Sequence, residues 1–178
     1  MIMKTKKLLI AGCLLAGLAF TACDDDDDET TLNNADTTFM TQASLSNTAE
    51  DSAATTTLTK GTNTAVKAFA SHMLAEHSTA QVDLKNLGNS VGYPVRDTLD
   101  PLHKLKGDTL KMLPVGRRFD SVYIWNQVID HQMTILNFQV HQAGGQHRDV
   151  KAYNTNKLPH IQSHLTRADS IARAYFPR

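Results

Sequence analysis

The sequence predicts an all-α protein, an antiparallel four-helix bundle with a short extra helix between the second and third long helices. Three observations support this class. Apolar side chains recur at steps of three and four residues in four long stretches. Glycine and proline interrupt the chain between those stretches. No part of the expected domain alternates apolar and polar residues over a useful length, so we expect no sheet.

Residues 1–22 have the layout of a bacterial lipoprotein signal peptide. Three lysines precede an apolar run from Leu8 to Phe20, which is too short to span a bilayer comfortably. The run closes on Phe20-Thr-Ala-Cys23, which resembles a lipobox, where the cysteine becomes the lipidated first residue of the mature chain. Cys13 lies in the removed segment, so Cys23 is the only thiol left and no intrachain disulfide is expected. We expect lipidation at Cys23; the alternative is a free cysteine.

Residues 23–36 are expected to form a lipid-bearing, disordered tether. Asp24 to Glu29 is an unbroken acidic run, which repels itself into an extended, solvated chain. Acids directly after the lipid cysteine resemble the export signal of surface lipoproteins in Bacteroidetes, whereas the alternative is a simple spacer. We therefore expect an outer membrane lipoprotein that is exposed at the cell surface or otherwise faces the periplasm, with the membrane as its partner through the lipid.

Residues 37–178 are expected to form one domain with a single core. The chain has 18 basic and 18 acidic side chains, and the basic residues are scattered without interleaved aromatics. Nucleic acid is therefore not an expected partner. A protein or small-molecule partner is not identified by the sequence.

The first expected helix runs from about Thr37 to Lys60, and Gly61 ends it as a C-cap. The Thr55-Thr-Thr run is a poor helix former, so this helix should depend on tertiary packing. Its helical stripe consists of Phe39, Ala43, Ser46, Glu50, Ala53 and Thr57.

The second expected helix begins at a cap at Asn63 or Thr64 and ends at about Val91, before Gly92 and Pro94. Its stripe consists of Val66, Phe69, Met73, His77, Ala80, Leu84, Leu87 and Val91. The short extra helix is expected over residues 97–111, with Asp97 near its start and Pro101 inside its first turns.

The third and fourth long helices are expected over residues 117–143 and 146–176, separated by Gly144-Gly145. The third has a stripe of Ile124, Val128, His131, Ile135 and Phe138, widened by Trp125, Ile129, Met133 and Leu136. The fourth presents Leu158, Ile161, His164, Leu165, Ala168 and Ile171. Pro159 should kink this last helix.

Each long helix places one ionisable side chain among its apolar positions, and these are Glu50, His77, His131 and His164. A charge that is buried without a partner costs several kcal/mol. We therefore expect the four side chains to meet, either hydrogen-bonded to one another or around one transition metal. Three imidazoles and a carboxylate suit zinc, iron or copper, and bundle interiors hold such sites.

Three further residues are expected around this quartet. Glu76 and Asp130 directly precede two of the histidines, about 100 degrees around the helix, so we expect them to support the ligands or to fix a histidine on an adjacent helix. His160 lies four residues before the last histidine and can add a polar group to the same face. The other histidines are expected to be solvated: His72, His103, His141 and His147.

Three interpretations of the quartet stay open: a polar network without a ligand, a mononuclear metal or small-ligand site, and redox catalysis at a di-metal centre. The di-metal pattern Glu-x-x-His is missing, because Leu74 and Val128 stand three residues before the histidines of the second and third helices. No phosphate loop, nucleophile elbow, CxxC pair or HExxH helix occurs either. We assign no catalytic residue.

A set of short stretches carries a family resemblance across about residues 39–175. They are Phe39 with Glu50, Ala65-Val-Lys-Ala-Phe-Ala70, Met73 with Glu76-His77, Phe119-Asp120, Asp130-His131, and Leu158-Pro159 with His164-Leu165. Together they resemble the bacterial domain of unknown function 4142, a family of exported, ferritin-like helical bundles whose biochemical role is unsettled. The resemblance implies the fold and the export, but the first helix departs from the family pattern after Glu50.

The function we expect is that of a lipid-anchored envelope protein whose helical domain is a binding or structural module, with a metal as one occupant of its core. The alternative is a metal-dependent oxidase or stress-protective redox protein that uses the same quartet as ligands. A third hypothesis is a pH-responsive protein, because clustered core histidines lose their packing when they are protonated.

Overall fold

The computed structural model describes residues 29–178. The expected signal peptide, Cys23 and most of the acidic run lie outside these residues. Five α-helices and no strand occur in the described part: α1 (Asn34–Lys60), α2 (Thr64–Ser90), α3 (Pro101–Met112), α4 (Arg117–Gly144) and α5 (Arg148–Tyr175). The prediction of an all-helical domain is thus confirmed. Among residues 29–178, no helix combines the length and the hydropathy that a membrane span requires.

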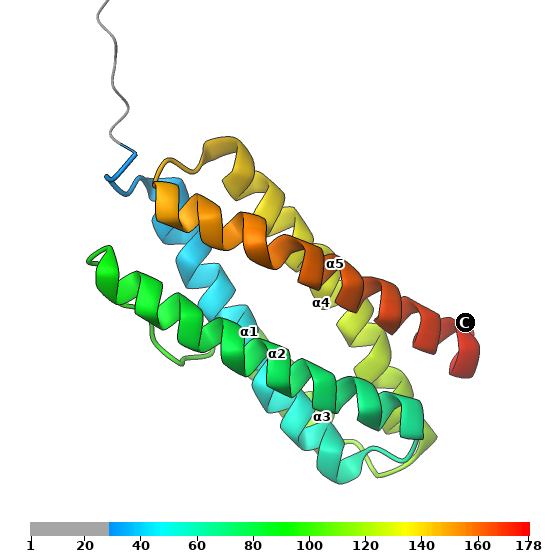
Figure 1. Cartoon of the computed structure of the whole chain (residues 1–178). Coiled ribbons are helices and arrows are strands. Elements are labelled where there is room, and N and C mark those ends of the chain that lie inside the picture. The colour runs from blue at the N-terminus through cyan, green and yellow to red at the C-terminus, as the bar shows by residue number, and fades with distance from the viewer. Residues whose placement is uncertain (1–28) are drawn as a thin grey trace, which may run out of the picture.

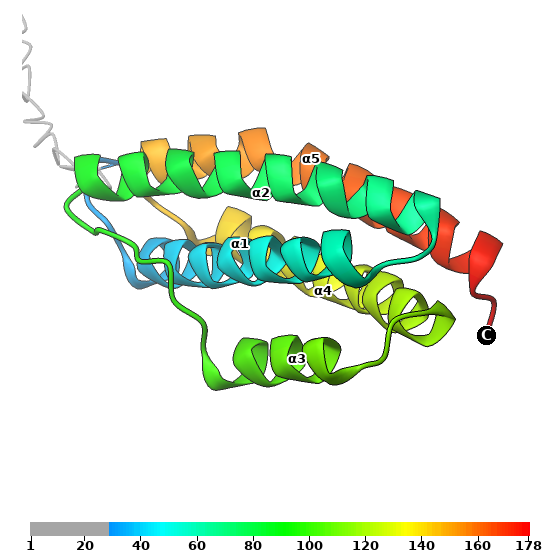
Figure 2. The same ribbon diagram turned by 90° about the horizontal axis from the view of Figure 1, so that it is seen from below.

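The helices form two layers with α3 outside them. Figure 2 shows α2 beside α5 in one layer and α1 beside α4 in the next, and the helices of the two layers also pack on each other. The short helix α3 packs against the outer side of α1 and α4. In Figure 1, α2 lies over α1 and α5 lies over α4, and the helices of each pair cross at an angle. Side chains from α1, α2, α4 and α5 therefore share one interior.

Two helix starts differ from the sequence prediction. The first helix begins at Asn34, inside the segment expected as tether, because Asn33 and Asp36 form a reciprocal capping box in which each side chain accepts from the other's backbone N–H. The short helix begins at Pro101 with Asp100 as its N-cap, and not near Asp97. A proline at the first helical position loses no hydrogen bond, which favours this later start.

Two buried aspartates, at opposite ends of the bundle, join the α1–α2 hairpin to the α4–α5 hairpin by hydrogen bonds. Asp36 on α1 accepts from the backbone N–H groups of Gln146 and His147 in the α4–α5 turn. Asp120 on α4 accepts from Thr62 and Asn63 in the α1–α2 turn. Asp36 and Asp120, and likewise Thr62 and Gln146, are each 84 positions apart. The α1–α2 and α4–α5 hairpins therefore repeat one design in the same register.

The apolar core is divided into two clusters along the length of the helices. One lies towards the α1–α2 turn and includes Phe69, Met73 and Tyr123. The other lies towards the α4–α5 turn and includes Phe39 and Phe138. On α2, α4 and α5 the sequence positions between the two clusters are those of the expected histidines. The middle of the bundle is therefore a polar layer between two apolar ones.

Part of the outer face of α4 stays uncovered by α3. Ile129, Met133 and Leu136, which widen the apolar stripe of this helix in the sequence, are 46%, 62% and 52% exposed. The narrower stripe of the same helix, with Ile124, Val128 and Phe138, is buried. The last helix continues through Pro159 without ending, and the proline side chain lies on its exposed face.

Candidate metal centre

Three of the four expected core residues meet in the polar middle layer. His77 on α2, His131 on α4 and His164 on α5 each offer a ring nitrogen, and these three nitrogens all lie within 4.8 Å of one another. The ring centroids are 5.7, 5.4 and 5.4 Å apart. Each side chain is at most 3% exposed. We call these three residues the histidine trio.

The tautomer of His131 follows from its one hydrogen bond. Its Nδ1 lies 2.9 Å from the backbone carbonyl oxygen of Gln127, one helical turn earlier on α4. A carbonyl can only accept, so Nδ1 carries the hydrogen and Nε2 keeps its lone pair. That Nε2 is buried and has no hydrogen-bond partner. It is therefore free to act as a metal ligand.

The other two members of the trio also keep a buried nitrogen without a partner. His77 Nδ1 lies 3.0 Å from Asn47 Oδ1, and its Nε2 has no partner. His164 Nδ1 is buried without a partner as well. Three unpartnered ring nitrogens thus occur in one small volume, whereas buried polar atoms in proteins are nearly always hydrogen-bonded.

Burial keeps the trio neutral. Desolvation, with smaller contributions from neighbouring histidines, lowers the pKa of His77 well below its usual range. Desolvation also lowers the pKa of His131 to about 4, although its bond to the Gln127 carbonyl opposes the shift. The pKa of His164 falls to about 3, again mainly through desolvation. All three imidazoles are therefore uncharged at neutral pH, which is the form that binds metals.

Glu50 does not join the trio, so the structure replaces the expected quartet with three histidines. The Glu50 carboxyl is buried and accepts a hydrogen bond of 2.7 Å from Gln127 Nε2. On α1 it is Asn47, three residues earlier, that faces His77. Burial, followed by the charge of Asp130, raises the pKa of Glu50 to about 8. Glu50 is thus mostly protonated at neutral pH and is linked to the trio only through Gln127.

The three residues expected around the quartet have other partners. Glu76 pairs with His160 on the adjacent helix α5, at 3.3 Å, and both side chains are more than a third exposed. Asp130 forms an ion pair with Lys106 of α3. No hydrogen bond joins Glu76, Asp130 or His160 to a trio nitrogen in the described residues. The carboxylates closest in sequence to the trio therefore leave it without a negative partner.

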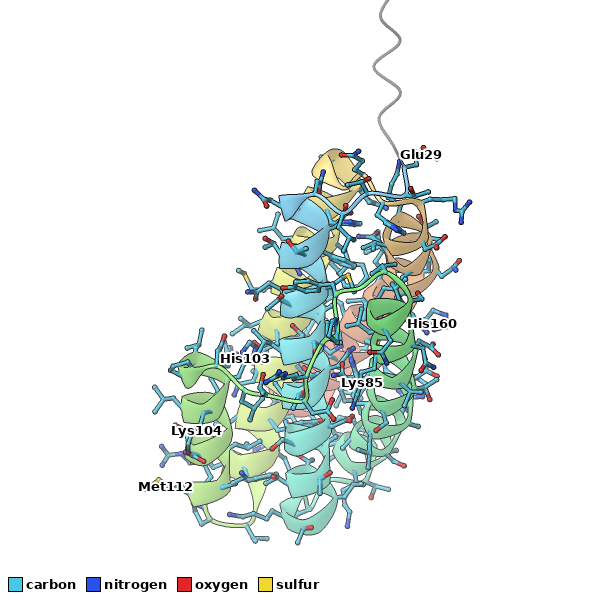
Figure 3. The ribbon with its side chains drawn as sticks, turned by 90° about the vertical axis from the view of Figure 1, so that its left-hand side faces the viewer. Glu29, Lys85, His103, Lys104, Met112 and His160 are labelled. Carbon is cyan, nitrogen blue, oxygen red and sulfur yellow. The ribbon has the colours of Figure 1, made fainter. Side chains whose placement is uncertain are left out.

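A small cavity of about 80 Å³ lies between α1, α2, α4 and α5, beside two members of the trio. His77 and His164 form part of its wall, and the side chains of Ser46 and Thr134 line it as well. Glu76 and His160 also line it, and His160 is labelled in Figure 3. The volume suffices for a few water molecules or one small ligand. A space of this size therefore adjoins two of the three histidines.

Sequence reasoning missed a buried cluster at the α4–α5 turn. His141 and His147 were expected in solvent, yet they are only 2% and 6% exposed. His141 Nε2 donates to Asp36 at 2.8 Å, and His147 Nδ1 caps α5 by accepting from the Asp149 N–H. Two signals for this cluster were present in the sequence. Asn33-x-x-Asp36 is a capping pattern, and His141 follows Phe138 by three residues on the buried stripe.

The cluster around Asp36 also sets the ionisation of that carboxylate. Burial by itself would raise the pKa of Asp36. The hydrogen bonds from the Asn33 and His147 backbone, from the His141 ring and from the Gln146 backbone outweigh burial and lower the pKa below its usual range. This buried acid is thus a charged, fully partnered group with a structural role.

The trio passes a simple test for a mononuclear metal. Three neutral imidazoles form a common zinc ligand set that leaves one position open, and imidazole also suits copper and iron. Tetrahedral bonds of about 2.0–2.1 Å place ligand nitrogens about 3.3 Å apart, so the trio would close by about 1.5 Å at most. His131 and His77 already present lone pairs that no other group uses. These residues therefore fit a metal, with Glu50 outside the ligand set.

The fold and this polar layer define a class, an all-helical protein with three neutral histidines buried in its middle. The chain belongs to the family described as Domain of unknown function (DUF4142), whose model matches residues 21–171. It is also similar to the crystal structure of a DUF305 fragment from Deinococcus radiodurans, at 10% sequence identity and a TM-score of 0.71. That match covers 80% of this chain and 98% of the other, and it shows the fold alone. No curated protein matches the chain.

Proposed function

We propose that this protein is a lipid-anchored envelope protein whose helical domain binds one transition metal ion through His77, His131 and His164. In this proposal the four long helices form an antiparallel, ferritin-like bundle, and residues 1–22 and Cys23 provide export and the lipid anchor. The observation that carries the metal site is the trio of buried ring nitrogens without partners, one from each of three helices. A metal ion would satisfy all three at once.

A polar network without a ligand accounts less well for the same atoms. His77 and His131 each use the hydrogen on Nδ1 for a partner outside the trio, so each presents a lone pair inward. Only the Nδ1 of His164 could supply a hydrogen, and one hydrogen satisfies at most one of the two lone pairs. At least one nitrogen would stay unsatisfied, at a cost of about 1–3 kcal/mol.

The alternative function is that of a metal-dependent oxidase or redox protein. The cavity beside His77 and His164 favours this alternative, because it leaves room for a small co-ligand such as dioxygen or peroxide. A bound redox metal would supply the electron transfer. The chain's own residues would orient the metal and exclude bulk water, with Ser46 and Thr134 available on the cavity wall.

Metal content provides the test of the site. We would purify the protein without a metal-binding tag and measure its metals by inductively coupled plasma mass spectrometry, before and after loading with zinc, copper or iron. We expect close to one equivalent in the parent and in the control His103→Gln, whose side chain lies on α3. His131→Leu should retain none and should be at least as stable as the metal-free parent. Absence of metal from the loaded parent would reject the site.

The same samples address the redox alternative. Consumption of oxygen or peroxide by the iron-loaded or copper-loaded parent, and its loss in His131→Leu, would favour the enzyme. Loaded protein that consumes neither oxidant would leave the binding module as the better description.

The anchor has its own test, since it depends on residues outside the described part of the chain. Cys23→Ser should stop the incorporation of a labelled fatty acid and move the protein from the membrane fraction to the soluble fraction. Cys13→Ser is the matched control, because that cysteine lies in the segment expected to be removed. Equal labelling of the parent and Cys23→Ser would contradict lipidation at this residue.

A further inference from the structure

His77 and His131 differ in how their Nδ1 hydrogen is held. His131 donates to a backbone carbonyl of its own helix, an acceptor that cannot turn around. His77 faces the side-chain amide of Asn47, whose two ends have nearly the same shape but opposite hydrogen-bonding roles. The end of Asn47 that faces His77 therefore decides which ring nitrogen carries the hydrogen.

A chain of directed hydrogen bonds fixes that amide from the surface of the protein. Asp97 accepts from Gln81 Nε2 at 2.8 Å, and a carboxylate can only accept. Ser44 Oγ, which donates to a backbone carbonyl, accepts the other hydrogen of the same nitrogen at 2.8 Å. Gln81 therefore turns Oε1 towards Asn47 Nδ2, at 3.2 Å. The Oδ1 end of Asn47 is left to face the histidine.

The acid that starts this chain lies on the connection between α2 and α3. Figure 3 shows this connection crossing α1, with Lys85 of α2 labelled beside it. Lys85 Nζ lies 2.7 Å from Asp97 Oδ2, and the Asp97 side chain is 54% exposed. Hydrogen bonds from Lys85 and then Gln81 lower the pKa of Asp97, so it is ionised at neutral pH.

We infer that Asp97 is a positioning residue for the metal site: through Gln81 and Asn47 it holds His77 in the tautomer with hydrogen on Nδ1. This inference rests on the proposed function, because its consequence is that the Nε2 lone pair faces the rest of the trio. Without the carboxylate, the Gln81 amide can turn around. Asn47 can follow once the Tyr153 hydroxyl, which also hydrogen-bonds Asn47, rotates its hydrogen from the Ala80 carbonyl to Asn47. A turned Asn47 presents Nδ2 to His77, which favours the hydrogen on Nε2, where the metal would bind.

The test compares Asp97→Ala with Lys85→Ala. Both variants remove the ion pair on the α2–α3 connection, but only Asp97→Ala removes the acceptor of Gln81. The tautomer of His77 would be read from its ¹⁵N chemical shifts in metal-free protein, and zinc affinity from competition with a chelator. We expect Nδ1–H in the parent and in Lys85→Ala, and a substantial Nε2–H population in Asp97→Ala. Zinc affinity should fall about tenfold or more in Asp97→Ala alone.

Thermal midpoints of the metal-free proteins separate positioning from general destabilisation. We expect Asp97→Ala and Lys85→Ala to have similar midpoints, since each loses an exposed ion pair. The inference is overturned if His77 keeps Nδ1–H in Asp97→Ala, or if both variants lose the same affinity. Failure of the parent to bind zinc would instead reject the proposed metal site, and the tautomer of the metal-free protein would still judge the hydrogen-bond chain.

Discussion

His141 at the α4–α5 turn and the histidine trio in the middle layer are equally buried, but their hydrogen-bond partners differ. His141 has a partner on each ring nitrogen: Nε2 donates to Asp36 at 2.8 Å, and Nδ1 accepts from Asn154 Nδ2 at 3.0 Å. Phe39 stacks on its ring with centroids 4.2 Å apart. In the trio, each imidazole keeps one buried nitrogen without a partner. Burial alone therefore does not distinguish a structural histidine from a candidate ligand.

The position of the acids explains the difference. Asp36 lies within hydrogen-bonding distance of His141 and of two turn N–H groups, so charge and geometry are matched at that end of the bundle. Around the trio the acids are turned away, since Glu50 is bound to Gln127 and Asp130 to Lys106. The trio is therefore a group of neutral imidazoles with unused lone pairs, whereas His141 and Asp36 form a fixed buried pair.

The largest loss of stability is expected when Asp36, the hydrogen-bond partner of His141, is removed. Asp36→Ala would leave His141 and the N–H groups of the turn without an acceptor. Removing one partner of a buried pair costs about 3–5 kcal/mol, a large part of the stability of an ordinary domain. Urea unfolding followed by Trp125 fluorescence would measure the loss, and zinc affinity at the trio should stay close to that of the parent.

Two control variants should lose less stability than Asp36→Ala. Asp36→Asn keeps one acceptor oxygen in the same volume, so it should recover part of the lost free energy. Asp169→Ala removes an exposed pair with Arg173 and should cost less than about 1 kcal/mol. If Asp36→Ala and Asp169→Ala lost equally little free energy of unfolding, the stabilising role of Asp36 at the α4–α5 turn would be wrong.

Most of the fold could be predicted because the spacing of apolar residues, and the glycines and prolines that end helices, are local signals in the sequence. The steps of three and four residues on α2, α4 and α5 placed the buried side chains, and Gly61 and Gly145 stand at the helix ends. Helix starts were harder to place where two aspartates compete. Asp97 and Asp100 are both good caps, and only the tertiary bonds from Gln81 and Lys85 show that Asp97 is used elsewhere.

The site could be predicted only in part, because a stripe gives the face of a residue but not its neighbours across the core. The stripes identified all three members of the trio. On α1 the predicted stripe included Glu50 but not Asn47, which lies three residues earlier and is also buried. Which of them faces His77 depends on how α1 is rotated against α2. The chain from Asp97 through Gln81 spans distant segments and leaves no pattern in the sequence.

A further effect is expected from pH, and it acts on the trio. Folding lowers the pKa of His131 to about 4 and of His164 to about 3, below the usual value of about 6.5 for an unfolded histidine. As pH falls below 6.5, the unfolded chain binds these protons first, so stability is lost. The thermal midpoint of the metal-free protein should therefore drop from pH 6.5 to 5. A flat profile in this range in Glu50→Gln, which lacks the opposing titration of Glu50, would contradict neutral, buried histidines, and bound zinc should raise the midpoint throughout.

Glu50 adds a second pH dependence of stability, because folding raises the pKa of Glu50 instead of lowering it. Its folded pKa of about 8 lies above the usual 4.5, so the stability that it contributes is complete below pH 4.5 and is lost as pH rises from 4.5 through 8. The loss between pH 7 and 9 is on the order of 1 kcal/mol. Glu50→Gln keeps an acceptor for Gln127 but cannot ionise, so it should remove this loss at alkaline pH and steepen the loss of stability that the histidines cause between pH 6.5 and 5. A pH profile of Glu50→Gln that matches the parent both between pH 5 and 6.5 and between pH 7 and 9 would contradict a raised pKa for Glu50.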